Sequence, residues 1–175
     1  MDYIIRKAVM DDACALAKIL SESWACAYKH IVPPVELARQ CDLFNNSDRF
    51  RAMLQAPRGE FYIALDGDVP CGEFMFCKSR DEDLPDYAEI VSIYSIEPYW
   101  GSGLGCAMMK TALSKITDFN FSNVLLWVFE ENARARNFYE KFGFVADGAK
   151  KNSHFTNKAS EVRYTLNLTQ CNKSF

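Results

Sequence analysis

The chain has 175 residues, of which 49% are hydrophobic and 25% charged, so we expect one globular domain spanning residues 1–175. Its net charge of −3 gives no basis for binding nucleic acid or an anionic membrane surface, and no stretch is apolar and long enough to span a membrane. Seven cysteines, odd in number and without a C-x-x-C pair, indicate reduced thiols in a cytoplasmic protein. Because neither His30 nor His154 has a cysteine at ligand spacing, we expect no metal site.

The first third of the chain predicts one strand followed by helices. Residues 3–8 have the pattern of a short strand, and Asp11 is expected to cap the helix that follows. Two further helical patterns occupy residues 35–44 and 48–56. This part of the chain is therefore expected to cover one face of a sheet rather than to form most of it.

The middle of the chain predicts a hairpin, a strand and a helix. Two β-rich runs meet at Asp66–Gly67, which is a favoured tight-turn pair, and a strand at 88–96 follows an acidic loop. Beyond the glycine-rich residues 99–105, an apolar stripe at i, i+4 spacing predicts a helix that packs on a sheet. The stripe consists of Leu104, Met108, Ala112 and Ile116.

The last third predicts a strand at 122–130, a helix that ends at Gly143, and two closing strands, of which the second is 161–168. Strands that alternate with helices in this order indicate the α/β class, with one mixed sheet and helices on both of its faces. Ligands of such sheets gather at the carboxyl ends of the strands, so the strand-to-helix connections are the first place to look for a site.

The connection at 99–105 reads YWGSGLG. Glycines between a strand and a helix can be a plain turn, but they also let backbone N–H groups converge at the positive end of a helix, where phosphate oxygens bind. A P-loop needs Gly-Lys-Ser/Thr, which is absent, and a dinucleotide fingerprint fails because Cys106 replaces its third glycine. The interpretation of the chain as a nicotinamide-binding redox protein therefore depends only on the Gly101-x-Gly103 spacing.

The following helix carries a polar stripe. Asn132, Arg136 and Tyr139 lie at i, i+4 and i+7 and are expected to share one side of the helix, about a quarter-turn from an apolar stripe. Each residue also has a plain structural explanation, since Asn132 can cap the helix and Tyr139 can be an aromatic residue at the edge of the core. The combination with the glycine turn favours a site.

With these motifs the sequence resembles the GNAT-type N-acetyltransferases, which transfer an acetyl group from acetyl-coenzyme A (acetyl-CoA) to an amine. IYSIEPYWGSGLGCAMMKTAL is similar to the family's diphosphate-binding segment, and LWVFEENARARNFYEKFGF to its N-x-x-A-x-x-x-Y-x-x-x-G-F segment. The opening IIRKAVMDDACALAKILSESWACAYKH also resembles the family's first strand and helix. The resemblance implies a single-domain GNAT fold with a mixed, mostly antiparallel sheet of six to seven strands and a V-shaped splay between its two central strands.

The resemblance implies that acetyl-CoA enters this splay as co-substrate, with no metal. Main-chain amides are expected to hold the diphosphate, and the pantetheine arm to pair with strand backbone. Trp100 stands where the family usually has Arg or Gln, so the amides are expected to bind without that side chain. The implied cofactor-binding residues are Ser95, Ile96, Trp100, Gly101, Ser102, Gly103, Leu104, Gly105, Asn132 and Arg136.

The chemistry needs a proton acceptor for the amine and a proton donor for the departing thiolate. The resemblance implies Tyr139 as the donor, and the oxyanion is expected to meet backbone N–H groups near Ser95–Ile96. Glu89, the best-placed carboxylate on an otherwise apolar strand, is the expected base, with a solvated strand-end acid as the equal alternative. His30 is a weaker candidate for the base, and ordered water can also accept the proton of the amine.

Acceptor-side signals are weaker. Trp24 and Tyr28 lie at i, i+4, as the acceptor-side aromatics of the family do, although a core stripe explains them almost as well. Acidic residues between Asp81 and Glu89 favour a small cationic amine such as a polyamine, although a solvated loop explains them better. Acetylation of a protein or peptide amine and a non-catalytic CoA-binding sensor are the alternatives, and a homodimer is possible.

Overall fold

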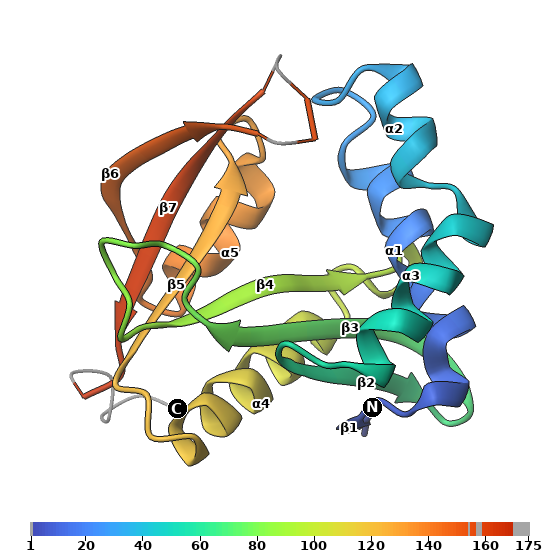
Figure 1. Ribbon diagram of the computed structural model, residues 1–175, viewed down its shortest axis with the longest axis horizontal. Coiled ribbons are helices and arrows are strands. Elements are labelled where there is room, and N and C mark those ends of the chain that lie inside the picture. Colours follow the sequence, from blue (N-terminus) through green and yellow to red (C-terminus); the bar gives the residue numbers. More distant parts are fainter. Residues whose placement is uncertain (1, 154, 157–158, 170–175) are drawn as a thin grey trace.

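A computed structural model describes residues 2–153, 155–156 and 159–169, so His154 of the sequence analysis lies outside the described residues. Its strands form one open sheet in the order β1-β2-β3-β4-β5-β7-β6, in which only β4 and β5 pair in parallel (Figure 1). This confirms the mixed, mostly antiparallel sheet. The strands are β1 (Ile4–Lys7), β2 (Glu60–Asp66), β3 (Val69–Lys78), β4 (Ala88–Ser95), β5 (Asn123–Phe129), β6 (Val145–Asn152) and β7 (Ser160–Asn167).

Helices cover both faces of the sheet, as expected (Figure 1). One hydrophobic cluster joins the sheet to α1 and α3, and a second joins its other face to α4 and α5. None of the helices within the described residues is long and apolar enough to cross a membrane. The helices are α1 (Ala13–Ala27), α2 (Pro34–Gln40), α3 (Leu43–Gln55), α4 (Leu104–Asp118) and α5 (Ala133–Lys141), with 3-10 turns η1 (Met10–Asp12) and η2 (Glu97–Tyr99).

Two local predictions about helix ends were wrong. The residue that precedes α1 is Asp12, not Asp11, because the Asp12 carboxylate accepts a hydrogen bond from the N–H of Val9 and pairs with Arg6. The helix expected at 35–44 stops at Gln40, and α3 begins earlier than expected because Asp42 caps it by accepting from the N–H of Asn45 at 3.0 Å.

The predicted hairpin is present, but its turn lies one residue later than expected. Asp66 still pairs with Val69 as the last rung of β2 and β3, so Gly67 and Asp68 make the turn. Gly67 has a φ of 58°, which is the left-handed conformation that tight hairpin turns require.

The splay between β4 and β5 is the feature that positions the site. The two strands pair at only three registered positions, from Ala88↔Val124 to Ile90↔Leu126. Beyond Ile90 the register of β4 against β3 shifts by one residue, which is a β-bulge, and β4 and β5 then diverge (Figure 1). The expected V-shaped opening therefore begins directly after Ile90.

The glycine-rich connection folds as a turn that ends in α4. Gly101 and Gly103 have φ values of 79° and 93°, which only glycine adopts readily, and Gly103 is the residue that precedes the helix. Leu104 and the three other residues of the predicted stripe are buried, so α4 is fixed against the sheet. The first amides of α4 have no partner within the helix and are left for other acceptors.

Candidate active site

A cavity of about 1380 Å³ fills the splay between β4 and β5. It reaches from the glycine turn before α4, past α5, to the side chains of α1 and α3 on the other face of the sheet. The cavity is therefore open both to a ligand held at the start of α4 and to one that approaches from α1. We call the first end the cofactor side and the second end the acceptor side.

On the cofactor side, Gly101, Gly103 and Gly105 line the cavity, whereas Ser102 and Leu104 do not. Side chains built on Gly101 and Gly103 would meet no atom within 4 Å, so the positive φ, not lack of space, requires glycine there. The Ser102 hydroxyl donates to the carbonyl of Tyr99 at 2.7 Å, which holds the turn in shape. Backbone N–H groups at a helix start make this corner a suitable site for an anion.

Trp100 anchors the same corner. Its indole Nε1 donates to the carbonyl of Ser95 at 2.9 Å, and the guanidinium carbon of Arg134 lies 3.4 Å from the centre of its ring. Arg134 comes from the first turn of α5 and lines the cavity together with Trp100. A positive charge is therefore present at the corner, although the sequence pattern has no arginine in the turn itself.

Arg136 lies elsewhere, and here the predicted polar stripe was wrong. Its Nε donates to the hydroxyl of Tyr164 at 3.0 Å and its Nη1 to the carbonyl of Glu130 at 3.1 Å, so the side chain does not line the cavity. Asn132 precedes the helix and caps it by accepting from the N–H of Ala135. Only Asn132 and Tyr139 of the three stripe residues reach the cavity.

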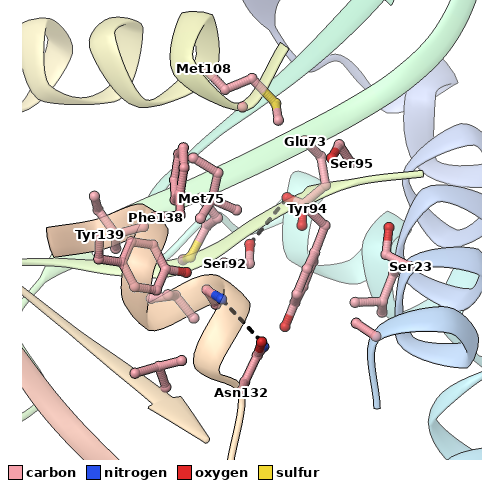
Figure 2. A pocket seen from close by; sticks show the side chains of 18 of the residues that line it. Ser23, Glu73, Met75, Ser92, Tyr94, Ser95, Met108, Asn132, Phe138 and Tyr139 are labelled. Carbon is pink, nitrogen blue, oxygen red and sulfur yellow. Dashed lines mark hydrogen bonds between the residues drawn. The ribbon is translucent and has the colours of Figure 1, made fainter. Parts of the chain in front are cut away.

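Tyr139 projects its hydroxyl into the cavity from α5 (Figure 2). The ring is held between Phe138 and Phe144, with centroids 5.5 Å and 6.0 Å away. Burial raises the pKa of the Tyr139 hydroxyl, so it is protonated at neutral pH. The hydroxyls of Tyr28 and Tyr94 are close enough to interact electrostatically with one another, and Tyr139 interacts with both.

The backbone of β4 presents Ser95, rather than Ile96, to the opening. The N–H of Ile96 donates to the carbonyl of Cys71 on β3 at 3.1 Å, and Ile96 does not line the cavity. Neighbouring residues of an antiparallel strand direct their backbone groups to opposite sides, so the N–H of Ser95 points away from β3 into the splay. Ser95 lines the cavity.

Glu89 lines the cavity, but its carboxylate is already paired. Arg80 donates to both of its oxygens, at 2.9 Å and 2.6 Å, and the N–H of Arg80 adds a third hydrogen bond. Both carboxylate oxygens therefore already accept hydrogen bonds, and neither is free to approach an amine. The geometry thus speaks against the expected role of Glu89 as base, and His30 is exposed and away from the cavity lining.

Glu73 is a cavity carboxylate that the sequence analysis missed. It is 1% exposed, lies on β3 opposite Tyr94, and accepts a hydrogen bond from the Ser92 hydroxyl at 3.1 Å (Figure 2). Burial raises its pKa to about 8. The only signal in the sequence was a charged residue in the middle of an apolar hairpin strand, and that signal does not tell which face the residue occupies.

Trp24 of α1 and Tyr28, which directly follows this helix, do lie together on the acceptor side. Their rings are 4.7 Å apart, edge to face, and Phe129 and Phe155 complete an aromatic wall. All four residues line the cavity. Both residues also belong to the hydrophobic core, as the structural explanation expects, and their role in binding an acceptor stays a prediction.

The acidic loop does not present its charge to the cavity. Arg163 of β7 pairs with Asp81, Asp83 and Asp147, at 2.9, 2.7 and 2.7 Å. The indole of Trp127 donates to Asp81 as well, at 3.0 Å. These contacts fasten the loop to β5 and β7, and they remove the basis for a polycationic acceptor.

Comparisons with known proteins agree with this geometry. A model of the acetyltransferase (GNAT) family matches residues 17–144. An uncharacterised N-acetyltransferase of Mycobacterium tuberculosis is 30% identical over 141 residues, which cover 81% of this chain and 88% of that protein. A PaiA N-acetyltransferase from Thermoplasma acidophilum, in complex with coenzyme A, matches with a TM-score of 0.72 at 17% identity, over 93% of this chain and 98% of that one.

The ribosomal-protein-S18-alanine N-acetyltransferase of Escherichia coli has the same fold, with a TM-score of 0.70 at 16% identity over 95% of this chain and 94% of that one. The family model covers more than half of the chain, and the mycobacterial relative is similar over most of its length. The chain belongs to the acetyltransferase (GNAT) family.

Proposed function

We propose that this acetyltransferase moves the acetyl group of acetyl-CoA to the primary amine of a small molecule, by direct attack through a tetrahedral intermediate. The observation that carries the proposal is one continuous cavity that joins the glycine corner before α4 to the hydroxyl of Tyr139 and to a second, aromatic-walled end. A thioester held from the corner and an amine held at the other end can meet in this cavity.

The residues of the cofactor side fit the coenzyme. The diphosphate is proposed to bind the amides of Gly101–Gly105, where two positive φ angles and the start of α4 gather N–H groups. Arg134, stacked on Trp100, adds the cation. When bound, acetyl-CoA supplies the activated acetyl group, and the solved PaiA structure contains coenzyme A in the same fold.

The protein's own groups then have separate roles. Tyr139 donates a proton to the departing sulfur, because its hydroxyl is protonated at neutral pH and points into the cavity. The N–H of Ser95 faces the splay and stabilises the oxyanion. Asn132 uses its side-chain oxygen to cap α5 and also hydrogen-bonds the Tyr28 hydroxyl, and from this position it is proposed to orient a water or an amide of the cofactor.

The buried aromatic wall favours a small molecule over a protein amine as the acceptor, although the Escherichia coli neighbour is by its name an enzyme for a ribosomal protein. A sensor that binds the coenzyme without turnover has no specific observation in its favour, since Tyr139 and Asn132 both reach the cavity. A cytoplasmic location and a homodimer stay predictions; light scattering of the purified protein measures the second.

Two assays test the proposed function. Calorimetry with acetyl-CoA and with NAD should show binding of acetyl-CoA only. A thiol-release assay with a panel of small amines and amino-terminal peptides should then show amine-dependent release, with small amines preferred. Binding of acetyl-CoA without thiol release for any amine would indicate a sensor. Faster thiol release with peptides than with small amines would indicate that the acceptor is a protein amine.

A further inference from the structure

The acceptor side of the cavity contains buried polar atoms that have no hydrogen-bond partner among the described residues. They are Ser23 Oγ on α1 and Glu73 Oε1 on β3, together with Trp24 Nε1 on α1, whose one polar neighbour is the more distant hydroxyl of Tyr94. The three residues are 2%, 3% and 1% exposed, and all of them line the cavity. Because a buried polar atom without a partner costs free energy, such atoms around a cavity indicate where a ligand supplies the missing hydrogen bonds.

Glu73 is placed where the cavity opens. Its other oxygen, Oε2, accepts from the hydroxyl of Ser92, which directly follows the β-bulge of β4 against β3 (Figure 2). Tyr94 faces it from β4, and Arg49 of α3 is the cation that acts on its charge. The free oxygen of Glu73 therefore lies beside the part of β4 that the proposed function assigns to the reacting groups.

The cavity has three carboxylates in its lining, and two of them are paired. Glu89 is bound at two points by Arg80, and Glu161 lies 3.8 Å from the amine of Lys151. No ion pair to Glu73 is present within the described part of the chain. Glu73 is therefore the one lining carboxyl group without a partner cation among the described residues, and it is ionised above about pH 8 or when an ammonium group beside it favours the charged form.

The geometry points to Glu73 as the group that binds and deprotonates the acceptor amine, and to a small monoamine with an apolar body as the acceptor. This inference rests on the proposed function, since it names the substrate class of the same site. One unpaired carboxylate matches one ammonium group, whereas a polyamine would bring further cations beside Arg49, Arg80 and Lys151, which also line the cavity.

The protons balance in this arrangement. The Glu73 carboxylate takes one proton from R–NH₃⁺, which leaves a neutral amine and a neutral carboxyl group. The amine lone pair forms the C–N bond, the C–S bond breaks, and the sulfur takes a proton from Tyr139, which regains one from the new amide nitrogen. The pKa of Glu73 is raised to about 8, which reduces the difference between it and the pKa of an alkyl ammonium group, about 10.4. A smaller difference makes the proton transfer less unfavourable.

The remaining unpaired atoms and the aromatic wall describe the rest of the acceptor. Rings of Trp24, Tyr28 and Phe129 pack edge to face, and an apolar body fits against them. Trp24 Nε1 can only donate, and the Ser23 hydroxyl can donate, so an oxygen atom on the acceptor satisfies both. A ring with a hydroxyl group and one aminoalkyl arm combines these features.

The test compares 2-phenylethylamine, its 4-hydroxy analogue, spermidine and a tripeptide with a free amino terminus as acceptors. With wild-type enzyme we expect the 4-hydroxy analogue to be the best substrate and spermidine to be at least about tenfold poorer. Glu73→Gln should lower kcat/KM for the monoamines about 100-fold without changing acetyl-CoA affinity, and should remove the pH dependence near the Glu73 pKa. Glu60→Gln, the same change on the neighbouring strand outside the cavity, should behave as wild type.

The outcomes separate this inference from the proposed function. Equal activity of Glu73→Gln, or a preference for spermidine or the tripeptide, overturns the inference and leaves acetyl transfer intact. If acetyl-CoA binds but no amine is turned over, the proposed function fails, and calorimetry of the 4-hydroxy analogue with coenzyme A present still decides the inference. Binding that Glu73→Gln weakens supports the monoamine site, and no binding overturns it.

Discussion

The two sides of the cavity are built from different parts of the protein chain. The cofactor side consists mainly of backbone groups from one continuous turn, with Gly101 and Gly103 in a conformation that other residues avoid. The acceptor side consists of side chains such as Trp24 and Glu73, which come from different elements and meet only in the folded sheet. A backbone site is expected to tolerate changes of side chain, whereas a site built from side chains is expected to change its ligand with a single substitution.

The largest expected effect of a substitution falls where the two sides meet. Tyr139→Phe should lower kcat roughly 100- to 10,000-fold, because the departing sulfur loses its proton donor. Coenzyme A affinity should stay nearly unchanged, since the ring and its contacts with Phe138 and Phe144 remain. Steady-state kinetics with calorimetry checks both, and an unchanged kcat would remove Tyr139 from the mechanism.

The next effect isolates the cofactor side. Gly103→Val should weaken coenzyme A binding about 100-fold, because a β-branched residue is strained at a φ of 93° and distorts the amides at the start of α4. Gly148→Val is the matched control: Gly148 has a φ of 92° and equally open surroundings, but lies in β6. If both variants bind coenzyme A like wild type while circular dichroism shows them folded, the diphosphate lies elsewhere.

A smaller effect distinguishes two neighbouring arginines. Arg134→Met should weaken coenzyme A binding about tenfold, since it removes the cation stacked on Trp100 at the corner. Arg136→Met should leave this affinity unchanged and instead lower the melting temperature, because Arg136 holds Tyr164 and the Glu130 carbonyl. If Arg136→Met weakened coenzyme A binding and Arg134→Met only lowered the melting temperature, the polar stripe expected from the sequence would be correct.

The smallest effect concerns stability on the acceptor side. Burial raises the pKa of Glu73 from 4.5 to about 8, so between these pH values the folded chain binds more protons than the unfolded chain. The contribution of Glu73 to the free energy of unfolding is therefore fully present below pH 4.5 and is lost as the pH rises through about 8. Melting temperatures should therefore fall more steeply with pH in wild type than in Glu73→Gln, and parallel curves would contradict a buried, unpaired Glu73.

The sequence predicted the local structure of the glycine turn and of α4 well because its signals are local. Alternating glycines before the Leu104 stripe predict a turn and a buried helix from nearest-neighbour geometry alone, and the structure has both. The residue-level errors came from distant partners. Arg136 donates to the hydroxyl of Tyr164 instead of lining the cavity, and Arg80 binds the carboxylate of Glu89. The spacing of residues along the sequence does not predict either contact.

The acceptor side could be predicted only in part. Trp24 and Tyr28 follow from their spacing on one helix, and they do lie on the cavity. Glu73 depends on the register of β3 against β4, in which a single bulge decides which side chains face α1. The acidic loop favoured a cationic acceptor in the sequence because Arg163, which pairs with Asp81 and Asp83, lies 80 or more residues away in the chain.

A crystal structure of the enzyme with coenzyme A tests the central claim most directly. The account predicts the diphosphate on the amides of Gly101 to Gly105, with Arg134 beside it and the sulfur within reach of the Tyr139 hydroxyl. A coenzyme bound outside the opening between β4 and β5, or with its sulfur remote from Tyr139, would contradict it.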